Sequence, residues 1–88
     1  VERAFDAIMA HYGRIDCAFN NAGIEGRYAR TVDYTDEDFA QTFAVNVHGV
    51  FYCLRRELRE MLKNPDGGAI VNTASITGLV GWRGAPAY

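Results

Sequence analysis

Residues 15–23 read Ile-Asp-Cys-Ala-Phe-Asn-Asn-Ala-Gly, an apolar run that ends abruptly in asparagine and glycine. Residues 15–19 have the length and composition of a short buried strand, and the asparagines and the glycine that follow favour a turn. The same pattern returns at residues 69–74, Ala-Ile-Val-Asn-Thr-Ala, which are followed by Ser75 and a glycine-containing loop. The sequence therefore predicts two short strands, each with polar residues directly after it.

A long helix is predicted between the two strands. Thr35 is a good N-cap, and Asp38 stands three residues later, as in a capping box. Apolar residues then recur at spacings of three and four: Phe39, Phe43, Val47, Val50, Leu54, Leu58 and Met61. Residues 64–68, Asn-Pro-Asp-Gly-Gly, are strong turn residues that end the pattern, so we expect the helix to span Asp36 to Lys63.

A second helix precedes the first strand, because apolar residues fall at helical spacing from Val1 to Tyr12 and Gly13 stops the pattern. The order helix, strand, helix, strand implies two parallel strands joined by a crossover helix. Parallel sheets are buried on both faces, which two helices cannot achieve. We therefore expect residues 1–88 to be part of an α/β fold with a Rossmann-type doubly wound parallel sheet, truncated at both ends.

Composition excludes several classes of partner. The net charge of −2 gives no reason to expect nucleic acid or an anionic membrane, and no apolar run approaches the ~18 residues of a membrane span. Two cysteines, Cys17 and Cys53, are too few for a disulfide scaffold and lack the spacing of metal ligands. We expect them to be buried free thiols in a reducing cytoplasm, and we expect no metal site.

Four features follow one another in order along the chain. They are Asn20-Asn21-Ala22-Gly23 after the first strand, Asn46 in mid-helix, Ser75 at the end of the second strand, and Tyr88 thirteen residues later. Together they resemble the short-chain dehydrogenase/reductase family, and the resemblance runs the whole length of the chain. It implies an oxidoreductase that transfers a hydride between NAD or NADP and a secondary alcohol or ketone.

The resemblance also implies a role for each residue. A first group would contact the cofactor: Asn20, Asn21, Ala22, Gly23, Thr73 and Tyr88. Ser75 would hydrogen-bond to the substrate oxygen, and Tyr88 would be the general acid/base. Asn46 would distort its helix slightly and hold a water molecule of the proton relay. A free phenol has a pKa of about 10, so such a tyrosine needs nearby positive charge to work near neutral pH.

Two features of the family fall outside these residues. They are the glycine-rich turn that receives the pyrophosphate, before Val1, and the Lys that supplies positive charge four positions after Tyr88. We therefore expect the chain to be an internal piece of a longer parent and to be inactive alone. The resemblance further implies a homo-oligomeric parent, a dimer or tetramer that associates partly through the helix at Asp36 to Lys63.

Simpler interpretations exist for each motif. Taken alone, Asn20–Gly23 is an ordinary turn, Asn46 is a buried amide bonded to the backbone, and Ser75 caps the turn that follows it. Only their joint spacing with Tyr88 favours catalysis. A non-catalytic Rossmann-fold binding or regulatory protein is the main alternative, because a fold does not decide function, and a pure assembly module ranks behind it.

The substrate class stays open beyond an alcohol or ketone. Four residues near the predicted turn and the last loop suggest a partly apolar pocket: Ile24, Tyr28, Leu79 and Trp82. Glu25 and Arg30 could meet polar groups of a substrate. A Ser-His-Asp hydrolase is disfavoured, because Ser75 is not part of a Gly-x-Ser-x-Gly elbow.

Overall fold

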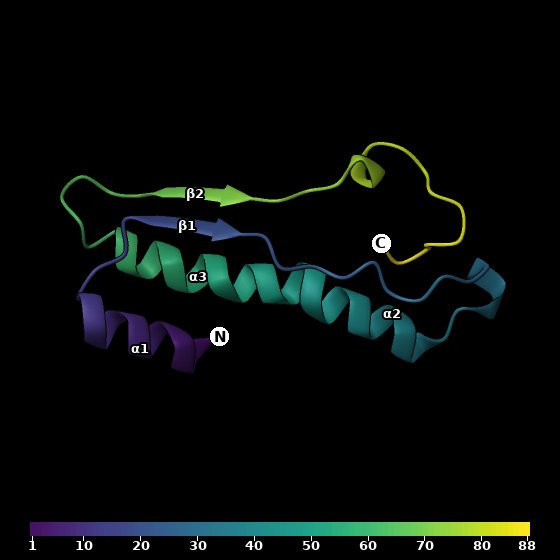
Figure 1. The fold of residues 1–88 in the computed structure, drawn as a ribbon, viewed down its shortest axis with the longest axis horizontal. Coiled ribbons are helices and arrows are strands. Elements are labelled where there is room, and N and C mark those ends of the chain that lie inside the picture. Colours follow the sequence, from purple (N-terminus) through teal and green to yellow (C-terminus); the bar gives the residue numbers. More distant parts are fainter.

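The computed structural model describes residues 1–88 as three helices and two strands (Figure 1). In chain order these are α1 Glu2–Tyr12, β1 Cys17–Asn20, α2 Asp36–Phe43, α3 Val50–Met61 and β2 Ala69–Asn72. The predicted order of helix, strand, helix and strand is confirmed. Short 3₁₀ turns at Thr31–Asp33 and Ile76–Gly78 lie in segments predicted as loops. None of the helices combines the length and the apolar character needed to cross a membrane.

The two strands pair in parallel, as predicted, with Cys17 opposite Ala69 and Asn20 opposite Asn72. One backbone hydrogen bond continues the pairing past the strands, because the Thr73 N–H donates to the Asn20 carbonyl at 2.9 Å. The two chains therefore leave the sheet side by side at the carboxyl ends of the strands, where a doubly wound sheet binds its ligands.

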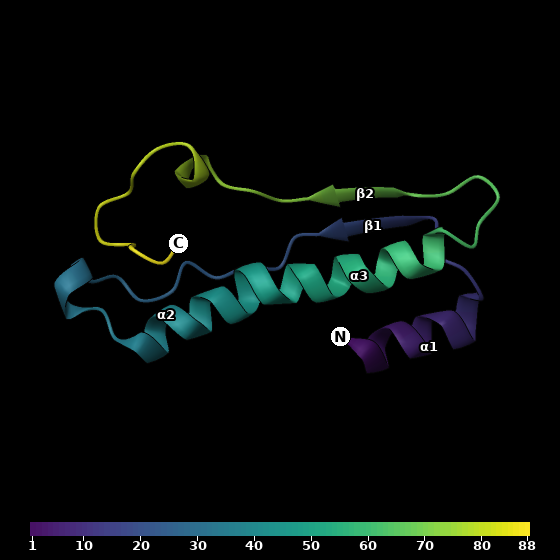
Figure 2. The same ribbon diagram turned by 180° about the vertical axis from the view of Figure 1, so that it is seen from behind.

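In both views of the ribbon the helices lie on one side of the strands (Figures 1 and 2). The other face of the sheet has no covering layer, and few side chains are buried. The buried residues are Ile15, Thr42, Glu57, Glu60, Met61 and Ala85. The prediction of two buried thiols is wrong for Cys17, which is exposed because it lies on a strand covered on one face only. Cys53 is half-buried.

The helix predicted at Asp36 to Lys63 is one continuous helical run that contains a break in its regularity. A π-helical segment, Ala44–Gly49, lies between α2 and α3, and it includes Asn46. The distortion expected at Asn46 is therefore present. A π turn holds more residues than an α turn, so the segment rotates the face of α2 relative to α3 by about one residue, or ~100°.

This rotation corrects the predicted apolar stripe. Phe39, Val47 and Leu58 are each about half exposed, although a regular helix would place all three on its buried side. Thr42 and Glu57 are the most buried residues of the run, at 1% and 2% exposure. The packed face therefore lies beside the stripe that the spacing predicts, and polar residues occupy part of it.

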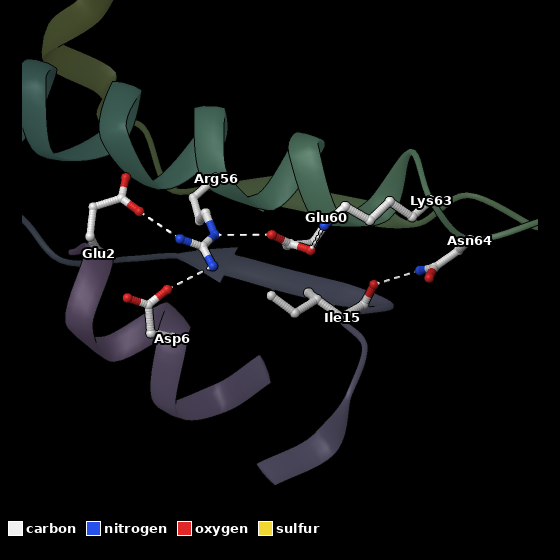
Figure 3. A network of polar contacts seen from close by, with 7 residues as sticks. All are labelled: Glu2, Asp6, Ile15, Arg56, Glu60, Lys63 and Asn64. Atoms are coloured by element: carbon white, nitrogen blue, oxygen red, sulfur yellow. Dashed lines mark hydrogen bonds and ion pairs between the residues drawn. The ribbon is translucent and has the colours of Figure 1, made fainter. Parts of the chain in front are cut away.

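Arg56 joins α1 to α3 (Figure 3). Its guanidinium donates to Glu2 Oε2 at 2.6 Å and Glu60 Oε1 at 3.1 Å, and it lies 2.9 Å from Asp6 Oδ1. Arg56 and Glu60 lie four residues apart on α3, and Glu60 is only 5% exposed. A hydrogen bond from Lys63 lowers the pKa of Glu60, and the positive charges of Lys63 and Arg56 lower it further. Burial of the carboxylate acts in the opposite direction but is outweighed.

The loop between β1 and α2 is anchored at the start of the helix. Thr35 caps α2 as predicted, since its Oγ1 accepts from the Asp38 N–H at 3.1 Å. The Asp38 carboxylate accepts from the Thr35 hydroxyl at 2.8 Å and from Arg27 at 3.0 Å. These two hydrogen bonds lower the pKa of Asp38. Arg27 lies in the loop itself, so its ion pair holds the loop beside α2.

Candidate active site

Asn21 and Thr73, the residues that directly follow β1 and β2, meet at the carboxyl ends of the two strands. The Thr73 hydroxyl donates to Asn21 Oδ1 at 2.6 Å, which links the residue after β1 to the residue after β2. Asn20 behaves differently, because its amide nitrogen donates to Asn72 Oδ1 at 2.9 Å and to Glu57 Oε2 at 3.0 Å. Asn20 is therefore turned toward the sheet and α3, whereas Asn21 and Thr73 face the space beyond the strands.

Asn46 projects from the π-helical segment toward the loop after β1. Its Nδ2 donates to the Ile24 carbonyl at 2.7 Å, and its Oδ1 accepts from the Ile24 N–H at 2.9 Å. A Cβ atom added to Gly23 would lie 3.4 Å from the same Oδ1, an ordinary van der Waals distance. Half of the amide's hydrogen-bonding capacity is used here, and one N–H and one lone pair remain.

Ser75 follows β2 and caps the 3₁₀ turn Ile76–Gly78. Its Oγ accepts from the Thr77 N–H at 3.3 Å and from the Thr77 hydroxyl at 2.9 Å. Ser75 therefore does cap the turn that follows it, as the simpler interpretation holds. Because both bonds are accepted by the oxygen, the hydroxyl hydrogen of Ser75 stays free to donate to another group.

One pocket of about 440 Å³ gathers the predicted site residues at the carboxyl ends of the strands. It is lined by Asn21, Ala22, Gly23, Asn46, Thr73, Ser75 and Tyr88, together with Ile24, Glu25, Val50, Ala74, Thr77 and Gly78. Every predicted site residue is present except Asn20. Residues separated by 67 positions in the chain, Asn21 and Tyr88, thus border the same space.

Two loops frame this pocket and are joined to each other. The Ala29 N–H donates to the Gly84 carbonyl at 2.9 Å, so the loop after β1 carries the segment that ends at Tyr88. Figure 2 shows this segment, in yellow, bending back toward the loop. The Tyr28 hydroxyl donates to Glu25 Oε2 at 2.9 Å, and this bond raises the pKa of Tyr28.

Six residues were expected near the substrate, and the structure places two of them in the pocket lining. Ile24 and Glu25 line the pocket. Tyr28, Leu79 and Trp82, which were expected to make the pocket partly apolar, lie outside it and are exposed. Arg30 is also outside, where it pairs with Asp33 at 2.6 Å.

A sequence profile described as short chain dehydrogenase matches residues 1–88. The chain belongs to this family. A 3beta-hydroxysteroid dehydrogenase from Mediterraneibacter gnavus is 40% identical over 88 residues, which are 100% of this chain and 31% of that relative.

Solved structures resemble this chain over nearly its whole length. NAD+-bound xylitol dehydrogenase has a TM-score of 0.89 at 40% identity over 97% of this chain and 32% of its own. ElxO with NADP bound has a TM-score of 0.88 at 34% identity over 98% of this chain and 34% of its own. The chain therefore spans about a third of the length of these three proteins.

The chemistry of the pocket lining fits part of a nicotinamide cofactor. A volume of about 440 Å³ lies in the ordinary range for small-molecule sites. The lining offers amide and hydroxyl groups from Asn21, Thr73 and Ser75 but no Lys or Arg. Such groups match a ribose, a carboxamide or a ketone, whereas a pyrophosphate calls for cations or a helix N-terminus. No cluster of His, Cys, Asp and Glu suited to a metal ion is present.

Proposed function

We propose that these 88 residues are an internal part of a longer NAD(P)-dependent short-chain dehydrogenase/reductase that acts on a secondary alcohol or ketone. One observation carries the proposal: Asn46, Ser75 and Tyr88 border one pocket at the carboxyl ends of two parallel strands. The similarity to a xylitol dehydrogenase and to a 3beta-hydroxysteroid dehydrogenase supports an alcohol or ketone as the substrate class.

The proposed cofactor contacts are Asn21, Ala22, Gly23 and Thr73 at the strand ends, together with Tyr88, which lines the same pocket. Asn20 would contribute indirectly, through its bonds to Asn72 and Glu57. The bound nicotinamide supplies or accepts the hydride. NAD and NADP both stay possible, since one related structure holds NAD+ and another NADP.

Ser75 and Tyr88 would share the substrate oxygen. In the reducing direction Tyr88 donates a proton to that oxygen, and in the oxidising direction it removes one. Ser75 donates a fixed hydrogen bond to the same oxygen, where negative charge develops. Its free hydroxyl hydrogen suits this task, because Thr77 already supplies both hydrogen bonds that the Ser75 oxygen accepts.

Asn46 would position the site and hold a relay water. Its two bonds to Ile24 fix the loop that borders the pocket. The remaining N–H and lone pair of the Asn46 amide are the groups that would bind water. Because they belong to a side chain anchored at both ends of its amide, the water would be held at a defined place beside the pocket.

We also propose that the full-length protein is a homo-oligomer that associates through α2 and α3. α3 leaves Phe51, Tyr52 and Leu58 exposed. Arg55 lies over both rings, 5.6 Å from the Phe51 centroid and 5.4 Å from the Tyr52 centroid. Sedimentation of the wild type and of a Phe51→Glu variant tests this proposal, and a monomeric wild type contradicts it.

The activity is tested by Tyr88→Phe in the full-length protein, with Tyr12→Phe as the control. Tyr12 is exposed on α1 and lies outside the pocket. Assays follow nicotinamide absorbance with NAD and NADP and a panel of secondary alcohols and ketones. We expect Tyr88→Phe to lose turnover by about 10²–10⁴ and Tyr12→Phe to keep it. A wild type without turnover and without affinity for either cofactor would favour the non-catalytic alternative.

A further inference from the structure

Glu57 is a buried carboxylate without a cation. It is 2% exposed on the face of α3 that packs against β1. Its neighbour Arg56 forms ion pairs with other carboxylates, those of Glu2, Asp6 and Glu60. A buried carboxylate is costly unless it is paired or hydrogen-bonded, and apolar residues often serve a packed helix face equally well. Packing alone therefore does not explain why residue 57 is a glutamate.

The partner of Glu57 is the amide of Asn20, whose nitrogen donates to Glu57 Oε2 at 3.0 Å. The same nitrogen carries a second hydrogen, which is donated to Asn72 Oδ1 at 2.9 Å. One amide group thus joins the helix to both strands at their last residues. Because Glu57 can only accept, it fixes which side of the Asn20 amide carries the nitrogen and so keeps the bond to Asn72 in place.

The next residue of each strand belongs to the pocket. The Asn20 carbonyl accepts from the Thr73 N–H at 2.9 Å, and the Thr73 hydroxyl donates to Asn21 Oδ1 at 2.6 Å. Asn21 and Thr73 both line the pocket. Hydrogen bonds therefore connect Glu57, which does not reach the pocket, to two residues of its lining, with the links between them made by the side chain and backbone of Asn20 and of Thr73.

We infer that Glu57 is a positioning residue for the cofactor pocket, acting through Asn20 on Asn21 and Thr73. The inference rests on the proposed function, which makes these two residues cofactor contacts. Glu60 is a matched control for burial and charge, because it is a second buried carboxylate of α3, 5% exposed, and it bonds to Arg56 and Lys63 instead of to the strands.

The test measures dissociation constants of the full-length protein for NAD and NADP by titration calorimetry, beside melting temperatures and steady-state kinetics. Glu57→Leu is expected to raise the Kd of the preferred cofactor about tenfold, the order of one coupled hydrogen-bond network. Glu57→Gln keeps an acceptor oxygen and should stay within about twofold of the wild type. Glu60→Leu should lower the melting temperature and leave the Kd unchanged.

A second variant does not depend on the packed layer. Asn72→Ala removes the other bond of the Asn20 amide and leaves every side chain of α3 unchanged, and it should also raise the Kd. At saturating cofactor both Glu57→Leu and Asn72→Ala should recover most of kcat, since the effect lies in KM for the cofactor.

Unchanged cofactor affinity in both Glu57→Leu and Asn72→Ala, with the wild type binding normally, overturns the role of Glu57 and leaves the proposed function intact. An equal loss in Glu57→Leu and Glu60→Leu overturns it too, because it would then be a general effect of lost stability. A wild type that binds neither NAD nor NADP overturns the proposed function, and the inference about Glu57 with it.

Discussion

Asn46 and Ile24 are joined by two hydrogen bonds in opposite directions, from Asn46 Nδ2 to the Ile24 carbonyl at 2.7 Å and from the Ile24 N–H to Asn46 Oδ1 at 2.9 Å. The side-chain amide thus pairs with a loop residue as a neighbouring strand would. The π-helical segment Ala44–Gly49 and the loop after β1 are therefore fixed to each other beside the pocket.

The first prediction follows from this pairing. Asn46→Leu favours a regular helix by propensity, but it leaves the Ile24 N–H and carbonyl without partners, at a cost of about 1–3 kcal/mol each if they stay dry. We expect a lower melting temperature and lower activity per folded molecule in the full-length protein. Val47→Leu, a change at an exposed neighbour in the same segment, should alter neither. A more stable Asn46→Leu variant with normal turnover would mean that the pairing is dispensable.

Ser75 provides the second prediction. Ser75→Ala removes the free hydroxyl hydrogen and should reduce turnover of a ketone by about 10²–10³, the range for losing one fixed donor to a developing oxyanion. Cofactor affinity should barely change. Thr77→Val is the control, because it removes only one of the two bonds that Ser75 accepts and should cost far less. The measurement is turnover by nicotinamide absorbance, and full turnover of Ser75→Ala would remove Ser75 from the mechanism.

Local patterns predict the elements of this fold well. The strand predicted at 15–19 is found at Cys17–Asn20, one residue into the predicted turn, and the strand predicted at 69–74 is found at Ala69–Asn72. The cap at Thr35 is found as predicted, and Gly13 ends α1 with a φ of 75°. The parallel pairing follows from the length of the crossover, which is too long for a hairpin. Each of these features depends on neighbours in the sequence, which is why the sequence reveals them.

The sequence does not predict which face of the long helix is buried, nor contacts between residues far apart in the chain. The spacing from Phe39 to Met61 assumes a regular helix, so the π-helical segment displaces the buried face without any signal in the apolar pattern. Glu57 was not predicted because its hydrogen-bond partner, Asn20, lies 37 residues away in the sequence. The pocket residues were found from the resemblance, whereas Leu79 and Trp82 were misplaced because loop paths leave no periodic pattern.

Glu60 makes stability depend on pH, which is the third prediction. Its pKa in the folded protein lies below the ordinary glutamate value of about 4.3, so the folded state binds fewer protons than the unfolded state. The stabilisation is present above about pH 4.3 and is lost as the pH falls through the lower, folded pKa. Melting temperatures of the full-length protein measured in acid should fall less steeply for Glu60→Gln than for the wild type. Glu37→Gln, at an exposed carboxyl, should follow the wild type. If melting temperature fell equally steeply with pH in all three proteins, Glu60 would not be a source of the pH dependence.

The fourth prediction concerns the start of β2. A Cβ at Gly68 would lie 2.6 Å from the Met61 side chain and 2.9 Å from the Asp16 carbonyl. That carbonyl accepts the Ala69 N–H at 2.9 Å, so it cannot retreat without loosening the strand. Gly68→Ala should destabilise the full-length protein by about 1–3 kcal/mol, measured by urea unfolding. Gly78→Ala meets nothing within 4 Å and is the matched control, and equal stability of the two variants would contradict the close packing.

The last prediction is that residues 1–88, prepared as a separate peptide, do not fold cooperatively and have no dehydrogenase activity. Only 6 of the 88 side chains are buried, far too few to offset about 1–2 kcal/mol of backbone entropy for each ordered residue. Phe19 and Val71, both on the strands, are 67% and 60% exposed, and the open edges of the sheet favour aggregation. The pocket also lacks cations for a pyrophosphate. Circular dichroism should show partial helix from α1 to α3 without a sharp melting transition, and calorimetry should show no saturable binding of NAD or NADP. A two-state melt together with cofactor binding by this peptide would contradict the prediction, because the buried side chains described above would then be enough for an independent fold.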